Sequence, residues 1–509
     1  MNALLVLYNP PLSEYALKPV LNGKNSITLA FEQAQKFPGV KKAVLLTSGN
    51  NDFSFLDGIH IEQRDFWTKK SLLEKISELM TGFDLTYFAF ADCPFLDPEL
   101  AGAISKRHLD YAAEYSYADG WPFGLAPETL SPGTAGILSK ILNEDGPVER
   151  DILFSVIQKD INAFDIEAEI SITDLSHHRL YLTADTKRNF LLLERFIGLS
   201  GRNIPTSIDV EKIIINQPEI LRTLPIYYPV QVYGGCPGEC VICPYPKFTN
   251  AKERKDYMPI DKFETLLDNI INFSDDAVIG LSLWGELSFH PEKLKLIESV
   301  INKKELSLVI ETSGLGWKNE ELEKCAEISK HKKSISPLSW IVSLDSSDPK
   351  KYNELRGSGF SEANTCAKKL LSLFPDDCYV QAVRLKGEEE DTEKFYRFWK
   401  ENAGEKNIII QKYNDFCGSL EKKQASDISP VIRQTCWHIM RDMPILIDGT
   451  VPLCKDDMAI GNSSRILGNI FTDSLETIWQ NGERFYKEQC KKNYTELCAG
   501  CDEYYTYNF

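Results

Sequence analysis

The 509-residue sequence lacks three features that would place the protein at a membrane or on nucleic acid. It has no apolar run close to the ~18 residues that a membrane-spanning helix needs. No basic stretch precedes the apolar run at the amino terminus, as one would in a signal peptide. It also lacks a basic excess, since 57 Lys and Arg residues face 74 Asp and Glu residues and give a formal net charge of −17. We therefore expect a cytoplasmic, folded protein that binds neither nucleic acid nor membrane.

Cysteine is what the sequence has in excess, with thirteen residues and no secretory context. In a reducing cytosol, clustered thiols more often bind metal than form disulfides. Eight of the thirteen fall into two groups, namely Cys236, Cys240 and Cys243, and Cys436, Cys454, Cys490, Cys498 and Cys501. The other candidates, Cys325, Cys366, Cys378 and Cys417, are scattered, and we interpret them as packed thiols.

Apolar runs typical of buried strands alternate with helix-period segments, which predicts the α/β class. Residues 3–7, 43–47 and 85–90 predict parallel strands of an open amino-terminal sheet. Six later β-then-α units favour a partial (β/α)6 barrel of the TIM type, in which ligands gather at the carboxyl ends of strands. The predicted domains are 1–200, a turn-rich linker 201–228, a barrel 229–425, and a small hairpin-plus-helix domain 426–509.

The first cysteine group has the spacing Cys-x3-Cys-x2-Cys in a segment with glycine and proline, which lets a short loop bring Cys236, Cys240 and Cys243 together. Structural zinc usually takes two matched Cys pairs. Three thiolates without a nearby histidine suit three irons of a 4Fe–4S cluster and leave the fourth iron open. Half of a zinc ribbon is the alternative.

These residues resemble the radical S-adenosylmethionine (SAM) superfamily over about residues 229–414. The resemblance implies that the three cysteines carry the catalytic cluster, and that Glu286 binds the methionine amino group of SAM. Trp284 stands where the family has a glycine, and Ile242 where an aromatic residue is common. The full set of residues that it implies for cofactor binding is Ile242, Gly285, Glu286, Ser343, Asp345 and Arg356.

The second cysteine group predicts a fully ligated site. Residues 445–454 are typical of a β-hairpin with Asp448 and Gly449 as its turn, which would return a cysteine toward the earlier one. Four thiolates can hold an iron–sulfur cluster, and structural zinc is the alternative. The spacing resembles the SPASM/Twitch extension of radical SAM enzymes and implies one auxiliary 4Fe–4S cluster on Cys436, Cys454, Cys498 and Cys501. Cys490 is interpreted as a free thiol, with an alternative ligand role left open.

The amino-terminal part resembles the sugar nucleotidyltransferases of the cytidylyltransferase and spore-coat-polysaccharide type. Asp92 and Asp185 match acidic positions that hold a divalent metal in that family. The loop after the first predicted strand has no glycine, and only Lys18 remains as a phosphate-binding cation. We therefore expect a degenerate domain that binds a nucleotide or sugar at most, or serves as a scaffold.

Taken together, the three parts resemble the group called spiro-SPASM proteins. The implied function is a radical SAM oxidoreductase that takes hydrogen from a carbohydrate, nucleotide-linked sugar or peptide substrate. A reduced flavodoxin or ferredoxin-type protein would donate its electrons. The alternatives are a maturase of ribosomally made peptides and a non-enzymatic iron–sulfur sensor or scaffold.

Overall fold

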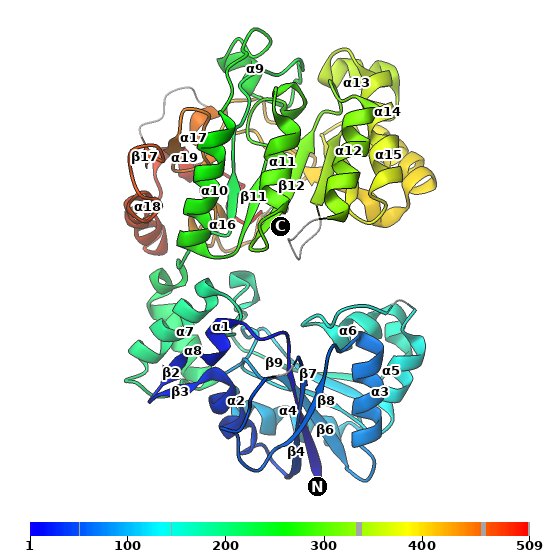
Figure 1. Cartoon of the computed structure of the whole chain (residues 1–509), viewed down its shortest axis with the longest axis vertical. Coiled ribbons are helices and arrows are strands. Elements are labelled where there is room, and N and C mark those ends of the chain that lie inside the picture. The colour runs from blue at the N-terminus through cyan, green and yellow to red at the C-terminus, as the bar shows by residue number, and fades with distance from the viewer. Residues whose placement is uncertain (50, 144, 332–337, 460–464, 507–509) are drawn as a thin grey trace. The chain divides into compact units, whose positions relative to one another are not determined.

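The computed structural model describes residues 1–49, 51–143, 145–331, 338–459 and 465–506 (Figure 1). The chain divides into two compact units, Met1–Thr223 and Leu224–Phe509. Within the described ranges, no helix is long and apolar enough to cross a membrane. Each unit is an α/β assembly with its own sheet, so the expected fold class is confirmed.

The first unit is built on a mixed sheet. Its central strand is buried at every residue, because an unbroken apolar run suits a strand covered by helices on both faces. In spatial order the strands of the described sheet are β5 (His60–Arg64), β4 (Val40–Ser48), β1 (Ala3–Asn9), β6 (Leu85–Phe90), β8 (Glu128–Leu130), β7 (Tyr115–Asp119) and β9 (Ile166–Ile170). Strand β8 runs antiparallel to both of its neighbours, whereas the other pairs are parallel.

Helices and a small two-stranded sheet complete the first unit (Figure 1). Strands β2 (Pro19–Leu21) and β3 (Lys24–Asn25) pair with each other. The helices are α1 (Glu14–Leu17), α2 (Ser26–Ala34), α3 (Lys69–Leu79), α4 (Pro98–Asp110), α5 (Thr134–Ile141), α6 (Ile152–Ile157), α7 (Lys187–Leu199) and α8 (Ser207–Asn216).

Part of the segment predicted as a linker, 201–228, is folded into the first unit. Helix α8 begins after the capping residue Thr206 and buries an apolar face that includes Val210 and Ile214. The backbone N–H of Ser207 donates to the buried Asp97 carboxylate at 2.7 Å. The prolines that suggest a linker flank this helix rather than interrupt it, and the first unit ends at Thr223.

The second unit is built on a parallel sheet of six strands within the described residues, arranged in sequence order. The strands are β10 (Tyr227–Pro229), β11 (Ala277–Gly280), β12 (Leu306–Thr312), β13 (Leu338–Ser343), β14 (Cys378–Arg384) and β15 (Ile408–Lys412). The crossover helices and short helices are α9 (Tyr245–Phe248), α10 (Ile260–Ser274), α11 (Lys293–Ile301), α12 (Asn319–Lys330), α13 (Pro349–Arg356), α14 (Phe360–Leu373) and α15 (Glu389–Ala403). This order is that of the expected partial barrel.

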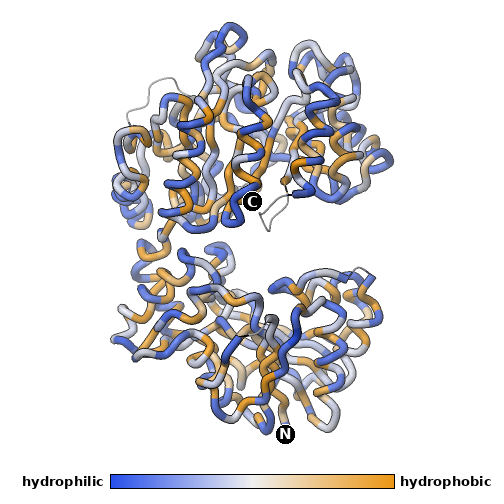
Figure 2. Tube along the Cα trace, in the orientation of Figure 1, coloured by the Kyte–Doolittle hydropathy of each residue, from blue (hydrophilic) through white to orange (hydrophobic). Residues whose placement is uncertain are grey.

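Amphipathic helices cover this sheet. Helix α10 buries Phe263, Leu266, Leu267 and Ile270, which recur at helical spacing on one face. Figure 2 shows the same division along the chain, with hydrophobic stretches in the strands and hydrophilic stretches in outer helices and loops. The carboxyl ends of the parallel strands are therefore fixed by a packed core behind them.

The carboxy-terminal segment of the second unit joins the sheet at its first strand. Val230 and Ile445 form a parallel bridge, and the Ile445 N–H donates to the Pro229 carbonyl at 2.9 Å. The remaining elements are α16 (Trp437–Arg441), β16 (Thr450–Pro452), α17 (Lys455–Ala459), β17 (Ile466–Asn469), α18 (Leu475–Cys490) and α19 (Glu496–Ala499).

The hairpin expected over 445–454 differs from the structure in its pairing. The Asp448–Gly449 turn is present, since the Gly449 N–H donates to the Leu446 carbonyl at 2.9 Å. Across the turn, the Leu446 N–H donates to the Thr450 carbonyl at 2.8 Å, so the expected hairpin forms at its first pair. Before that pair, the segment bridges the barrel edge through Ile445, and β16 pairs antiparallel with β17. The barrel edge offers the first arm unpaired backbone groups, which a local hairpin would have left exposed.

Candidate functional site

The three thiols of the Cys-x3-Cys-x2-Cys segment lie on the loop after β10, at the carboxyl end of the sheet. Two backbone hydrogen bonds hold this loop on the end of α13: Glu239 N–H donates to the Arg356 carbonyl at 3.2 Å, and Val241 N–H to the Leu355 carbonyl at 2.9 Å. A third bond, from Cys236 N–H to the Ala251 carbonyl at 2.9 Å, closes its base. The loop is therefore fixed from two sides.

The loop has the shape that a thiol-bound cluster requires. A Cβ added at Gly238 would lie 3.2 Å from the Cys240 sulfur and 3.6 Å from the Cys236 sulfur. Glycine thus leaves the space between the two sulfurs free, and the donor set consists of thiols alone. Three convergent thiols with an unobstructed space between them fit a 4Fe–4S cluster with one iron open to another ligand.

Burial changes the acidity of two of these thiols. It raises the pKa of Cys236 to about 12, with a further contribution from the nearby Glu286 carboxylate. It also raises the pKa of Cys243 to about 12. Both thiols are therefore protonated near neutral pH until a metal group takes up their charge, and cluster binding must release protons.

Glu286 follows β11 and is held by donors from the end of β12. It is only 3% exposed, and its carboxylate accepts from Thr312 Oγ1 at 2.7 Å, from Ser313 N–H at 2.7 Å and from Ser313 Oγ at 2.6 Å. Burial raises the pKa of Glu286, and these hydrogen bonds offset part of that rise. Its own N–H donates to the Gly235 carbonyl at 2.8 Å, which ties it to the cysteine loop.

Gly285 makes this connection possible. Its φ is +89°, and an added Cβ would lie 1.9 Å from the carbonyl oxygen of Tyr233. Only glycine fits this approach of two backbone segments. The preceding residue, Trp284, stacks on Tyr245 with ring centroids 5.6 Å apart.

Asp345 and Arg356 form a buried ion pair, with Arg356 Nη1 2.5 Å from Asp345 Oδ2. The other Asp345 oxygen accepts from Val383 N–H at 2.8 Å. Burial alone would lower the pKa of Arg356, but the neighbouring Cys240 and Asp345 raise it well above its usual value. A permanent cation therefore lies close to the cysteine loop.

Ser343 belongs to a polar layer across three neighbouring strands. Its Oγ donates to Glu311 Oε1 at 3.0 Å, and Gln381 Nε2 donates to both Glu311 at 3.1 Å and Ser343 at 3.2 Å. Ile242, in contrast, packs against an apolar cluster with Leu355 and Leu385. Sequence reasoning missed Gln381, which lies inside a strand and has no motif around it.

The second thiol group is brought together from four separate segments. Cys436 and Cys454 are both buried by their surroundings, which raises the pKa of each well above its usual value. The Cys454 sulfur accepts from Asp456 N–H at 3.2 Å, and the Cys501 sulfur from Glu503 N–H at 3.3 Å. Backbone donors of this kind stabilise cluster-bound thiolates, so the donor set fits an iron–sulfur cluster.

Cys417 is the principal residue that sequence reasoning assigned elsewhere. We expected a packed thiol, but its sulfur, a carboxylate oxygen of Asp456 and the Cys501 sulfur all lie within 4.8 Å of one another. The Cys417 thiol hydrogen-bonds to Cys501, which raises the pKa of Cys417 and lowers that of Cys501. The loop after β15 brings Cys417 here, and no sequence spacing connects it to the later cysteines.

Cys490 lies near this group, at the end of α18. Thr435 Oγ1 contacts its sulfur at 4.0 Å. The neighbouring Gln489 accepts from Cys436 N–H at 3.0 Å and so fixes the first cysteine of the group. Cys325, Cys366 and Cys378 are buried among apolar residues, as expected of packed thiols.

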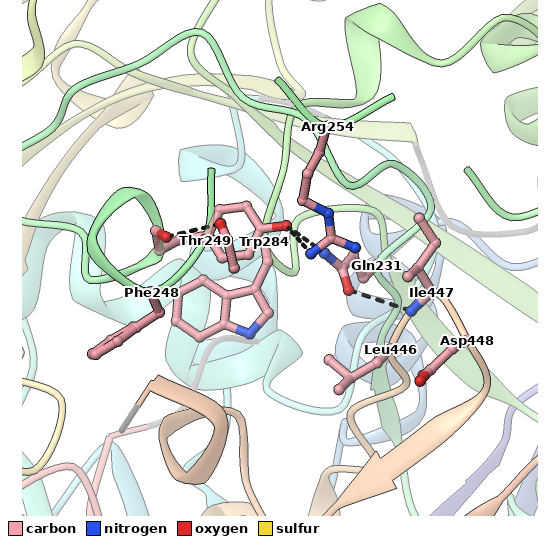
Figure 3. Close-up of a pocket in the computed structure, with 9 residues that line it drawn as sticks. Gln231, Phe248, Thr249, Arg254, Trp284, Leu446, Ile447 and Asp448 are labelled. Atoms are coloured by element: carbon pink, nitrogen blue, oxygen red, sulfur yellow. Dashed lines mark hydrogen bonds between the residues drawn. The ribbon is translucent and has the colours of Figure 1, made fainter. Parts of the chain in front are cut away.

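A pocket of about 200 Å³ opens between the cysteine-bearing segment and the turn before β16 (Figure 3). Its lining residues are Gln231, Tyr245, Phe248, Thr249, Arg254, Trp284, Leu446, Ile447 and Asp448. Three aromatic side chains face one cation and one carboxylate there. The Trp284 indole N–H is buried and has no hydrogen-bond partner among the described residues.

In the first unit, the structure brings Asp92 and Asp185 together, with an arginine between them. Arg150 donates to Asp92 at 3.1 and 2.6 Å and to Asp185 at 2.9 Å. Burial would raise the pKa of Asp185, but Arg150, Thr183 and Asn189 lower it below its usual value. Arg150 thus supplies a countercharge to the two carboxylates at the position where the sequence allows a divalent metal, and that metal stays a prediction.

Two known protein families match segments of the second unit. A family model described as the radical SAM superfamily matches residues 230–398, and an SPASM model described as an iron-sulfur cluster-binding domain matches residues 436–502. The chain belongs to the radical SAM superfamily. The resemblance seen in the sequence is thereby confirmed, and radical SAM membership indicates an enzyme that uses SAM and a 4Fe–4S cluster. The SPASM match implies auxiliary iron–sulfur binding, and it contains five of the cysteines discussed above but not Cys417.

Among relatives, an uncharacterized protein of Treponema pallidum (strain Nichols) is 33% identical over 365 residues, which cover 70% of this chain and 98% of that protein. A second uncharacterized protein of the same organism is 39% identical over 54 residues, 11% of this chain and 25% of that protein.

Solved structures with similar folds include two of different kinds. The radical SAM protein SuiB of Streptococcus suis, bound to its precursor peptide SuiA, is 16% identical, with a TM-score of 0.41, over 65% of this chain and 78% of that one. A cytidylyltransferase from Leptospira borgpetersenii is 17% identical, with a TM-score of 0.37, over 43% of this chain and 96% of that one.

Proposed function

We propose that the protein is a radical SAM oxidoreductase whose catalytic cluster is held by Cys236, Cys240 and Cys243. The single observation that carries this proposal is the convergence of the three thiols, two of them beside Gly238, next to Glu286 and Arg356, at the carboxyl ends of parallel strands. When bound, such a cluster supplies the electron that cleaves SAM and so generates the radical that takes hydrogen from substrate.

The remaining residues would bind and orient SAM. Glu286 offers a buried carboxylate for the methionine amino group, and the Thr312 and Ser313 donors favour its ionised form and fix its direction. Arg356 offers a cation for the SAM carboxylate, and Asp345 holds its guanidinium in place. Ser343 lies in the polar layer with Glu311 and is available to a ribose hydroxyl. Gly285 and Ile242 would contact the cofactor through backbone and apolar surface.

The auxiliary cluster would be held by Cys436, Cys454, Cys498 and Cys501, as the sequence predicts. Its thiol donors and backbone N–H groups suit electron transfer, because hydrogen bonds to sulfur stabilise the reduced form of such a cluster. It would accept an electron from the substrate radical, or pass one from a flavodoxin or ferredoxin-type donor. Full ligation by thiols excludes direct binding of the substrate to its irons.

The pocket beside Trp284 favours a substrate with a polar ring, such as a sugar or a sugar unit of a nucleotide-linked sugar. Aromatic side chains pack against the apolar faces of such rings, Asp448 suits their hydroxyl groups, and Arg254, which pairs with Asp256, adds hydrogen-bond donors. The unpartnered indole N–H of Trp284 requires an acceptor, which a ring hydroxyl supplies.

The decisive experiment is the measurement of 5′-deoxyadenosine formed from SAM by anaerobically reconstituted protein with a strong reductant. We expect formation by wild type and none by the Cys236/Cys240/Cys243→Ala variant. Cys325→Ala is the matched control, since it removes a fully buried thiol outside both groups. Formation that persists in the triple variant, or is absent from wild type that holds its full iron and sulfide, would refute the proposal.

A further inference from the structure

The auxiliary site has more ligands than one cluster needs. A 4Fe–4S cluster takes four thiolates, one for each iron. Beyond Cys436, Cys454, Cys498 and Cys501, the structure adds the Cys417 thiol and the Asp456 carboxylate, and both meet the sulfur of one and the same cysteine, Cys501. The two additional ligand groups, Cys417 and Asp456, thus both lie beside Cys501, at one corner of the site.

Two observations describe the ligands at this corner. Asp456 is 2% exposed, and its Oδ1 forms an ion pair with the Lys455 amine at 3.5 Å but accepts no hydrogen bond among the described residues. This buried oxygen therefore keeps lone pairs that can bind a metal ion. Cys417 is held here by a backbone with positive φ at two consecutive non-glycine residues, 52° at Phe416 and 55° at Cys417.

The closeness of Cys417 and Cys501 decides what the extra thiol can do. Thiolates bound to different irons of a four-iron cluster point outward from separate corners and therefore diverge. Two thiols in mutual contact can instead reach the same iron. The Cys417 thiol already hydrogen-bonds to the Cys501 sulfur, so a change of ligand needs only a small displacement.

We propose that Cys417 is a second ligand for the iron that Cys501 binds, so that either thiolate completes the auxiliary cluster. The exchange moves no electrons. The Cys417 S–H loses its proton as its sulfur binds iron, the iron–Cys501 bond breaks, and the released Cys501 thiolate takes up one proton. This inference rests on the proposed auxiliary ligand set.

The exchange would link the auxiliary cluster to the SAM site. Phe416, the residue before Cys417, packs its ring against Trp284, with centroids 5.7 Å apart. Trp284 in turn precedes the Gly285–Glu286 segment that is fixed to the cysteine loop. A movement of Cys417 onto or off the cluster therefore displaces a side chain in contact with the SAM-binding segment.

The test counts auxiliary iron in full-length protein that carries the Cys236/Cys240/Cys243→Ala background, so that only one cluster contributes. Iron, acid-labile sulfide and the Mössbauer spectrum are measured after anaerobic reconstitution. We expect Cys417→Ala and Cys501→Ala each to keep about four irons per chain, and the double variant to fall about tenfold. Cys436→Ala is the matched control and should lose its iron, because Cys417 is grouped with Cys501 and not with Cys436 among the described residues.

Each other outcome overturns a defined statement. A Cys501→Ala variant that loses as much iron as Cys436→Ala refutes the role of Cys417, as does a double variant that loads like Cys501→Ala. Iron loss from Cys417→Ala alone would make it an obligatory ligand, which also refutes the exchange. If Cys436→Ala loads like wild type, the proposed ligand set itself fails. Should Cys501→Ala not fold, Cys501→Ser with and without Cys417→Ala repeats the comparison at matched side-chain size.

Discussion

The two units differ in how the charge of their clustered carboxylates and thiols is balanced. In the first unit, the buried Asp92 and the partly buried Asp185 receive their countercharge from the chain itself, through Arg150. In the second unit, burial raises the pKa of Cys236, Cys243, Cys436 and Cys454, and these thiols are suited to an inorganic group that takes up their charge. We therefore expect a set of potential ligands to predict a metal best where no side chain of the protein already pairs with it.

The largest effect expected from this comparison concerns Arg150→Ala. The substitution leaves two neighbouring carboxylates without their cation, and we expect it to destabilise the first unit by about 3–5 kcal/mol. Hydrogen exchange of the β6 amides in the full-length protein measures this loss. Arg107→Ala is the control, because Arg107 pairs with Glu167 in a half-exposed site and should cost at most about 1 kcal/mol.

Arg150→Ala also tests whether Asp92 and Asp185 can still bind a metal ion, which would contradict the contrast drawn between the two units. If the acidic pair retains the capacity to bind a divalent cation, Mn²⁺ should restore part of the stability of Arg150→Ala and leave wild type unchanged. If Mn²⁺ has no effect on either protein, the pair is purely structural, and the likeness to a nucleotidyltransferase metal site extends no further than position.

A second prediction tests the geometry of the SAM-binding segment. Gly285→Ala places a Cβ against the Tyr233 carbonyl at a φ of +89°, and should destabilise the second unit by about 3 kcal/mol. It should also lower the iron bound by the first cysteine group, because Glu286 and Gly235 are joined through this segment. Gly387→Ala has a similar φ with open space around it and should cost only about 1 kcal/mol. Equal effects of the two substitutions would contradict the steric explanation.

A third prediction concerns the pH dependence of the stability of the first unit, to which Glu128 and His108 contribute with opposite signs. Burial raises the pKa of Glu128 to about 7, so its contribution to stability decreases as pH rises from about 4.5 to 7. Burial lowers the pKa of His108 to about 4, so its contribution increases as pH rises from about 4 to 6.5. The two slopes oppose each other in wild type.

Single substitutions should expose each slope. In Glu128→Gln, the stability of the first unit should rise by about 2 kcal/mol between pH 4.5 and 6.5, and in His108→Gln it should fall by about as much. Hydrogen exchange at several pH values follows both changes. A wild-type slope that survives unchanged in both variants would show that other groups control the pH dependence.

The smallest effect is expected for Phe416→Leu. Loss of the aromatic contact with Trp284 should cost about 1 kcal/mol and lower the rate of SAM cleavage by about fivefold at most. Phe398→Leu, which changes an aromatic residue that contacts Trp399, is the control. An unchanged cleavage rate in Phe416→Leu would show that the contact between Phe416 and Trp284 does not couple the auxiliary site to SAM cleavage.

The sequence allowed the first cysteine group and the barrel to be predicted because both are local signals. Cys236, Cys240 and Cys243 lie within eight residues, and each barrel strand is a short apolar run followed by a helix. The roles of these cysteines in catalysis stay predictions until cleavage is measured, but the superfamily itself is confirmed.

Long-range contacts explain what the sequence could not reveal. Arg150 reaches Asp92 across 58 positions, and Cys417 reaches Cys501 across the helices α16 to α19 and the β16–β17 pair. Neither residue has a spacing or a neighbour that indicates its partner. The helix over 207–216 was likewise obscured by prolines on both sides of it, because composition averages over a segment that begins and ends with turns.

The bridge between Val230 and Ile445 also determines when, during translation, the edge of the second sheet can be completed. The Ile447 N–H donates to the side-chain Oε1 of Gln231 across 216 positions, so the outer edge of β10 has no partner until the ribosome has added those residues. At about 5–20 residues per second, this edge stays open for about 10–40 s while the rest of the barrel forms. The nascent chain thus presents an unpaired strand to its neighbours on the polysome, and the carboxy-terminal segment acts as the closing piece that ends this period of exposure.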